Sequence, residues 1–187
     1  MDRPTWVLLE GASDVAAVQV LRAARGVDAE DEPCLLIDMG GATNVRRHVE
    51  RAAAADPLPR VIGMCDEREA PFFTRALDVI PTFTFTVCRR DLEDEFMRAL
   101  GLDGTLAVLE SVDLLTTFEA FTRQQAWQGR PLLDQLRRFV GTTSGRKELL
   151  AVALAGALDE ATTPAPLSDL LAEMPVPVAP GQGRPTS

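Results

Sequence analysis

Acidic side chains follow each of four short apolar runs in the first half of the chain. The segments that continue these runs are 10–14, 38–41, 66–69 and 91–95, which read EGASD, DMGG, DERE and DLEDE. Carboxylates that are brought together repel one another unless a cation joins them. Oxygen ligands suit hard divalent cations, and Mg²⁺ commonly binds a few carboxylates together with substrate phosphates. Two such ions about 3.5–4 Å apart serve in-line phosphoryl displacement. The acids therefore predict a divalent-cation site.

A parallel sheet would bring these acids together. Short apolar runs predict strands at 6–9, 34–37, 60–65 and 82–87, and helical spacing predicts helices at 13–25, 43–55 and 70–77 between them. Strands that alternate with helices form βαβ units, in which the strands are parallel. All the carboxyl ends then lie at one edge, where ligands bind. We therefore expect an α/β fold with a four-stranded, mostly parallel sheet flanked by helices.

The helix dipole offers another explanation for some of these acids. First turns of helices are enriched in Asp and Glu because the N-terminal end of a helix carries partial positive charge. That explanation covers the acids within first turns when each is taken alone. It covers Glu10 and Asp66 less well, since both close apolar strands before any helix begins.

Strand signals cease after residue 91. Helices are expected at 92–100, 114–128, 131–140 and 146–158, followed by a segment that holds six of the thirteen prolines and room for one short helix at 167–174. The expected organisation is an α/β core over 1–100, a helical subdomain packed on it over 101–160, and a Pro-rich mobile tail over 161–187.

Composition narrows the class of protein. The 187 residues carry a formal net charge of −9, which argues against binding nucleic acid by bulk positive charge but permits handling phosphate through cations. A single histidine excludes a His-rich zinc site. Three cysteines without CxxC spacing indicate reduced thiols and a cytoplasmic location. No apolar run reaches the roughly 18–20 residues that span a bilayer, so no membrane partner is expected.

The motifs, taken in order, resemble a known family. EGASD before a helix and CDERE after the third strand are similar to the TOPRIM domain of topoisomerases, primases and related nucleases. With MGGATNV, RRDLEDE and GRKELLAVALAGAL added, the chain resembles the overcoming-lysogenization-defect (OLD) nucleases over about residues 5–158. The resemblance implies a Rossmann-like TOPRIM domain that uses one or two Mg²⁺ or Mn²⁺ ions to break phosphodiester bonds in nucleic acid.

The resemblance also implies roles for individual acids. Glu10 would be a metal ligand or general base, and Asp14, one helical turn later, would face the same metal. Glu93 matches the acid after the last strand, which holds the second metal.

The DxD element departs from the family pattern. Asp66 opens this element and is expected to hold a metal, but Arg68 stands where the second acid belongs. Glu69, one residue further, is expected to substitute because a helical turn would bring it to the same face.

Basic residues and glycines complete the candidate site. Lys147 is the only lysine of the chain, and the family carries a basic residue there that faces the scissile phosphate. Gly40 and Gly41 could offer backbone amides to a phosphate or form only a tight turn. Arg89 and Arg90 could guide a nucleic-acid backbone beside the acids.

Three functions are open on the sequence. The first is metal-dependent phosphodiester hydrolysis by an endonuclease, with DNA preferred to RNA as the substrate. The second is a catalytically degenerate TOPRIM binding or regulatory module, which Arg68 would mark. The third is a phosphoacceptor or phosphatase α/β domain, although the DxDx[TV] motif is absent after the first strand.

OLD nucleases join the TOPRIM domain to an ATPase domain. The sequence contains no GxxxxGK[ST] motif, so a required ATPase would be a separate partner. The oligomeric state is left open.

Overall fold

A four-stranded parallel sheet forms the centre of the molecule. The computed structural model describes residues 3–141 and 144–177. The strands are β1 (Thr5–Leu9), β2 (Cys34–Asp38), β3 (Arg60–Asp66) and β4 (Thr84–Cys88). Their order is β2-β1-β3-β4, and every neighbouring pair is parallel. The expected α/β fold with a parallel sheet is therefore confirmed.

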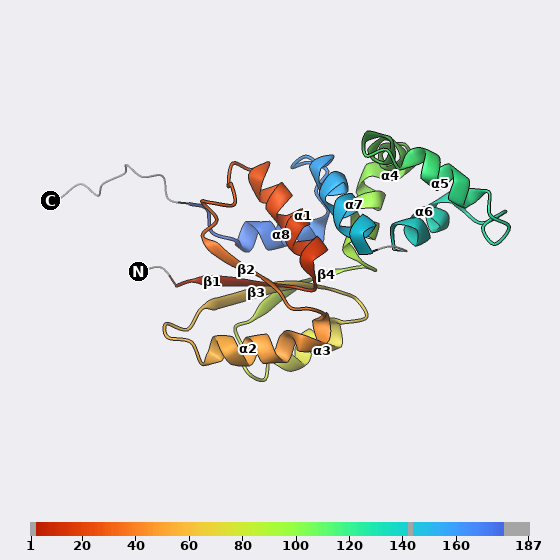
Figure 1. Cartoon of the computed structure of the whole chain (residues 1–187). Coiled ribbons are helices and arrows are strands. Elements are labelled where there is room, and N and C mark those ends of the chain that lie inside the picture. The colour runs from red at the N-terminus through yellow and green to blue at the C-terminus, as the bar shows by residue number, and fades with distance from the viewer. Residues whose placement is uncertain (1–2, 142–143, 178–187) are drawn as a thin grey trace.

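Helices cover both faces of the sheet (Figure 1). One face carries α1 (Ala12–Ala23), α7 (Ser144–Gly156) and α8 (Ala165–Glu173). The 3-10 helix η1 (Ala42–Asn44), α2 (Val45–Ala53) and α3 (Ala70–Ala76) cover the other face. The inner strand β3 is buried over residues 61–65, which explains its continuous apolar run. Among the described residues, no helix combines the length and the apolar character that a membrane span requires.

Three helices extend beyond the sheet: α4 (Leu92–Ser111), α5 (Leu115–Thr122) and α6 (Leu132–Val140). A kink divides α4 at Gly101, whose φ of 68° lies in the left-handed region that favours glycine. The helix expected at 92–100 ends at this kink, but its continuation to residue 111 was not expected. Helix α7 packs on both α1 and α4. It therefore connects α4, and with it α5 and α6, to the helices that cover the sheet.

The segment expected as a mobile tail begins with a packed helix. Helix α8 places Leu167, Leu170 and Leu171 in the core and contacts β3 and β4. Its last residue, Glu173, forms an ion pair with Arg60 at 2.6 Å and accepts a hydrogen bond from the Thr84 hydroxyl at 2.8 Å. The short helix expected at 167–174 is therefore present as α8. The expectation of a mobile tail is wrong for this part of the segment, because its leucines are buried in the core. Residues 178–187 lie outside the described range.

Gly63, at the centre of β3, leaves space for aromatic rings that pack on the sheet. A Cβ atom on Gly63 would lie 3.0 Å from the carbonyl oxygen of Leu8 and 3.2 Å and 3.3 Å from ring carbons of Phe73 and Phe83. The rings of Phe73, Phe83 and Phe85 pack with centroids 5.3–5.8 Å apart. Glycine is therefore needed so that these rings can lie on the strand.

We predict that Gly63→Ala lowers the free energy of unfolding by about 1–3 kcal/mol, because a methyl group overpacks this position. Urea denaturation measures the change. Gly156→Ala is the matched control: its Cβ atom would lie 3.8 Å from Val20, an ordinary contact, so we expect no loss of stability. Equal stability of the two variants would contradict this account of β3.

Candidate metal centre

The candidate site lies where the strand order reverses. The chain moves outward from β1 to β2, then crosses back to β3 on the other side of β1. In open parallel sheets, ligands bind outside the carboxyl ends of the strands at this switch point. Glu10 directly follows β1, and Asp66 is the last residue of β3. The two acids that the helix dipole explains least are therefore the two that flank the switch point.

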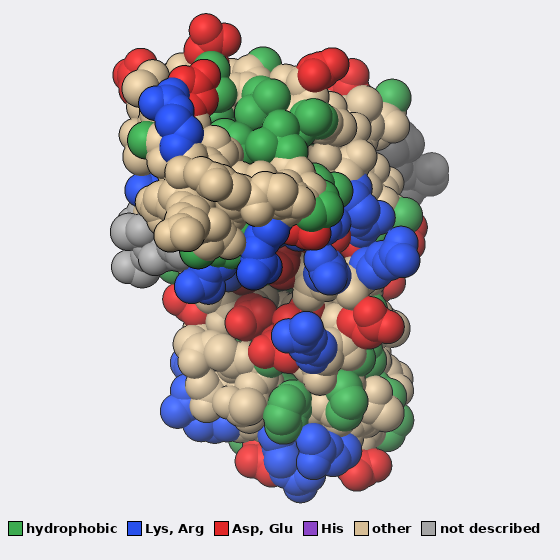
Figure 2. Space-filling view, turned by 90° about the vertical axis from the view of Figure 1, so that its right-hand side faces the viewer, with side chains coloured by type: hydrophobic (Ala, Val, Ile, Leu, Met, Phe, Trp, Pro, Cys, Tyr) green, Lys and Arg blue, Asp and Glu red, His purple; other side chains and the backbone are tan. Residues whose placement is uncertain are grey.

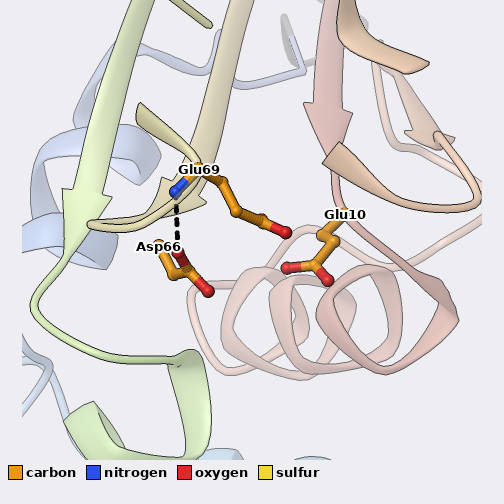
Figure 3. Close-up of side chains that lie close together, drawn as sticks. All are labelled: Glu10, Asp66 and Glu69. Carbon is orange, nitrogen blue, oxygen red and sulfur yellow. Dashed lines mark hydrogen bonds between the residues drawn. The ribbon is translucent and has the colours of Figure 1, made fainter. Parts of the chain in front are cut away.

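Glu69 joins these two acids. One carboxylate oxygen each from Glu10, Asp66 and Glu69 lies within 4.8 Å of the others, and Figure 3 shows the three side chains directed toward one another. The backbone N–H of Glu69 donates to Asp66 Oδ1 at 2.9 Å, so Asp66 fixes the turn that carries Glu69. Two oxygens on the same Mg²⁺ are at most about 4.2 Å apart, so small rotations would complete a three-ligand site.

A second group of predicted residues lies in an adjoining cavity of about 20 Å³, which is about the space for one water. Its charged lining residues are Glu10, Asp14, Asp66, Asp91, Glu93 and Lys147. Met64, Cys65, Cys88 and Leu92 form the rest of the wall. The structure thus brings together all five predicted metal ligands and the predicted lysine, in two groups that share Glu10 and Asp66.

Local backbone geometry positions the two buried acids of the cavity. Asp14 lies in the first turn of α1, where its Oδ2 accepts a hydrogen bond from the Gly11 N–H at 2.9 Å. Glu93 lies in the first turn of α4, behind the N-cap residue Asp91. Asp91 Oδ1 accepts from the Asp94 N–H at 2.8 Å, so the cap sets the direction of the helix that delivers Glu93.

Burial raises the pKa of both acids. Removal from water raises the pKa of Asp14 to about 6, and nearby Glu10 adds to the rise while Lys147 opposes it. Burial likewise raises the pKa of Glu93 to about 7, against the opposing charge of Lys147. The pKa of Glu69 is also raised, first by burial and then by a hydrogen bond with Glu10 and by the neighbouring carboxylates. Ionisation of these acids is thus unfavourable when no cation is present, first because of burial and then because of the neighbouring carboxylates.

Lys147 reaches this cluster from α7. Its Nζ lies 3.7 Å from Glu93 Oε1, and its side chain is 42% exposed. Burial lowers the pKa of Lys147, but the charges of Glu93, Asp14, Glu10 and Asp91 outweigh that effect and raise it. Lys147 is therefore a protonated ammonium with one side toward the acids and the other toward solvent.

Two buried carboxylate oxygens without hydrogen bonds indicate whether these residues suit a metal ion. Glu69 Oε2 and Glu93 Oε1 are buried, and neither has a hydrogen-bond partner within the described part of the chain. Glu93 Oε1 lies 3.7 Å from the Lys147 ammonium, which is beyond hydrogen-bond distance, and buried carboxylate oxygens without hydrogen bonds are costly. A hard divalent cation would satisfy both their charge and their lone pairs, so the donor set fits Mg²⁺ or Mn²⁺.

The other acids of α4 have a different role. Asp94 is held by Arg137 of α6 and by Arg98, whose Nε lies 3.2 Å from Asp94 Oδ2. Arg98 also pairs with Glu95, which accepts a hydrogen bond from the Arg89 N–H at 2.8 Å. Within DLEDE, Asp91 and Glu93 therefore line the cavity, while Asp94 and Glu95 are held by arginines. Sequence reasoning missed both arginines. The i,i+4 spacing of Asp94 and Arg98 could have indicated one of them, but no local signal links Arg137 of α6 to α4.

The predicted glycines do not offer a phosphate cradle. The Gly40 N–H donates to Asp38 Oδ1 at 2.8 Å, and the Gly41 N–H donates to the Glu10 carbonyl oxygen at 2.8 Å. Their φ angles of 65° and 112° show that both form a tight turn. The expectation that Gly40 and Gly41 bind substrate is therefore wrong for these two amides, and the turn interpretation holds.

Arg68 does not enter the acid cluster. It is exposed and lines a neighbouring hollow together with Arg89 and Arg90. The arginine in the DxD position thus lies on the rim of the site, while Glu69 lies with Glu10 and Asp66.

Comparison with solved structures bears on the fold. No protein-family model matches the chain, and a search of curated proteins gives no match. The C-terminal region of the OLD protein of Xanthomonas campestris pv. campestris aligns with a TM-score of 0.61 at 19% identity, over 91% of this chain and 93% of that one. The C-terminal region of the Burkholderia pseudomallei OLD protein aligns with a TM-score of 0.61 at 18% identity, over 92% and 96%. This chain has the fold of an OLD C-terminal region. The resemblance carried by the motifs is thus confirmed at the level of the fold.

We predict that, without divalent cations, the free energy of unfolding falls as the pH rises from about 4 to about 7. The pKa values of Asp14 (about 6) and Glu93 (about 7) lie above their unfolded values of 3.8 and 4.5, so the folded state holds more protons between these values. Ionisation then costs the folded state on the order of 2–3 kcal/mol for each group. Urea unfolding in EDTA at several pH values measures the fall.

Glu93→Gln should reduce this fall, because glutamine does not ionise. Glu50→Gln, an exposed change on α2, should leave it unchanged. If the wild type and Glu93→Gln show the same pH dependence, Glu93 does not have a raised pKa.

Proposed function

We propose that this protein hydrolyses phosphodiester bonds in nucleic acid, with Mg²⁺ or Mn²⁺ as cofactor. The observation that carries the proposal is the convergence of Glu10, Asp66 and Glu69 within 4.8 Å at the switch point of the sheet. The resemblance of the ordered motifs to the OLD nucleases supports the same reaction, as does the fold shared with OLD C-terminal regions. DNA is the proposed substrate.

Each residue of the centre has a proposed role. Glu10, Asp66 and Glu69 hold one cation, and Asp14 and Glu93 provide ligands for a second at the other end of the cavity. The chemistry that such cations supply when bound is stabilisation of phosphoryl charge and activation of water. Glu10, which belongs to both groups, is the proposed base that accepts a proton from the attacking water.

Lys147 is the proposed electrostatic partner of the phosphate. Its ammonium lies beside Glu93 and faces solvent on its other side, so an incoming phosphate would meet a positive charge there. A fixed cation stabilises the negative charge that develops on the phosphoryl oxygens as the bond to the leaving oxygen breaks.

The two other functions have less support. A degenerate binding module would have lost its ligands, but Glu69 joins the acid cluster although Arg68 does not. A phosphoacceptor domain needs a lysine at the end of a strand, whereas Lys147 lies on helix α7.

We predict that Mg²⁺ or Mn²⁺ stabilises the native state by mass action. A cation at about 100 times its Kd should raise the melting temperature by about 5–10 °C. Glu10→Gln and Asp66→Asn should each remove most of that rise. Glu67→Gln, which changes the exposed residue next to Asp66, should retain it. An equal rise in all four proteins would mean that the cation binds elsewhere.

We predict that the wild type nicks supercoiled plasmid DNA when Mn²⁺ is present. Glu10→Ala and Asp66→Ala should each reduce the rate by at least about 100-fold, because metal assistance is worth several kcal/mol. Circular dichroism and urea unfolding check that both variants are folded. A folded wild type that binds the cation but cleaves neither DNA nor RNA would favour the binding-module function instead.

A further inference from the structure

An arginine-lined hollow adjoins the acid cavity. Its volume is about 330 Å³, and it shares Asp66 and Asp91 with the cavity. The arginines come from three separate segments, namely the loop after β3, the loop after β4, and helix α6, and they are Arg68, Arg89, Arg90 and Arg137. Figure 2 shows Lys and Arg side chains gathered across the middle of this face, with Asp and Glu side chains among them.

Three of these arginines are available to a ligand. Arg68, Arg89 and Arg90 are exposed, and their side chains form no ion pair or hydrogen bond with any residue in 3–141 or 144–177. Arg137 differs, because it is held by Asp94 and Asp134. In a chain with a net charge of −9, three neighbouring guanidinium groups therefore lie together without an ion-paired acid among the described residues.

The acids of the hollow do not cancel this charge once the centre is loaded. Its acidic lining residues are Asp66, Glu67, Asp91 and Asp94. Asp94 is already shared between Arg137 and Arg98. Asp66 belongs to the proposed cation site. With a divalent cation bound, the hollow therefore carries net positive charge directly beside the reacting centre.

We propose that this hollow binds the backbone of a nucleic-acid strand, at the phosphates next to the one in the acid cavity. Guanidinium groups match phosphate oxygens with paired hydrogen bonds and remain charged at every physiological pH. Such contacts fix the register of the strand without reading its sequence. Arg68 then contacts substrate at the position where the DxD pattern has an acid. This assignment rests on the proposed function, since it takes the acid cavity as the place of the reacting phosphate.

Salt-dependent binding tests the assignment without cleavage. Fluorescence anisotropy of a short labelled single-stranded oligonucleotide, with Ca²⁺ in place of Mg²⁺ or Mn²⁺, gives Kd over a range of KCl concentrations. Arg68→Gln, Arg89→Gln and Arg90→Gln should each reduce the slope of log Kd against log salt by about 0.7, the value for one lost phosphate contact on a single strand. The triple variant should lose about 2. Arg47→Gln, an exposed arginine on α2, is the matched control and should leave the slope unchanged.

Two results would overturn the assignment. One is a triple variant with the slope of the control. The other is inorganic phosphate that displaces the oligonucleotide as well as a trinucleotide does, because the hollow would then be a site for small anions.

The nuclease proposal can fail separately. If the arginine variants change the slope but the wild type cleaves nothing, the hollow binds a strand and the proposed reaction is wrong. If the wild type cleaves DNA and the slopes do not change, the reaction stands and the hollow assignment is wrong. Calorimetric titration with Mn²⁺ should give the same affinity for the wild type and the triple variant, which separates strand contacts from effects on the metal centre.

Discussion

The burial of neighbouring carboxylates at one edge of the sheet is the constraint on which the rest of this structure depends. Parallel strands place the acids that follow them at a single edge, and the switch point brings the acids of the two inner strands closest together. Burial then raises the pKa of Asp14 and Glu93 to about 6 and about 7, so the arrangement is unfavourable at neutral pH. A fold retains such a cluster when a cation compensates for the repulsion, and this makes the centre the natural place to look for function.

The protein deals with its acids in two different ways. Acids that stabilise the fold have arginine partners, as Asp94 and Glu95 have in Arg98. Within the described ranges, the acids of the centre form an ion pair only with Lys147, whose Nζ is 3.7 Å from Glu93 Oε1. The same distinction separates the arginines, because those around the centre lack acidic partners while Arg137 is fixed by two. Charges left without protein partners therefore gather on one face, negative inside and positive at the rim.

Much of this arrangement could be predicted from the sequence, and the reason is local. Short apolar runs and the residues after them fix where Glu10 and Asp66 lie, because a parallel sheet has only one edge for carboxyl ends. The position of Glu69 beside Asp66 follows from the turn that Asp66 fixes. Contacts between distant segments could not be predicted. The pairing of Arg137 with Asp94 spans 43 residues. The packing of α8 on β3 and β4 depends on tertiary contacts, whereas the prolines around α8 are typical of a mobile segment.

The centre is assembled from parts of unequal rigidity. Glu10 and Asp66 extend from the two innermost strands, which hydrogen-bond to each other and have neighbours on both sides. Glu93 lies on α4, which also contacts α5 and α6, and Lys147 lies on α7, which also contacts α6. Helix α7 also packs on α1, and α4 begins directly after β4, so both side chains are anchored to the sheet as well. A change in α5 or α6 would therefore reach Glu93 and Lys147 before the strand-borne acids, which separates retention of a cation from its engagement with a phosphate.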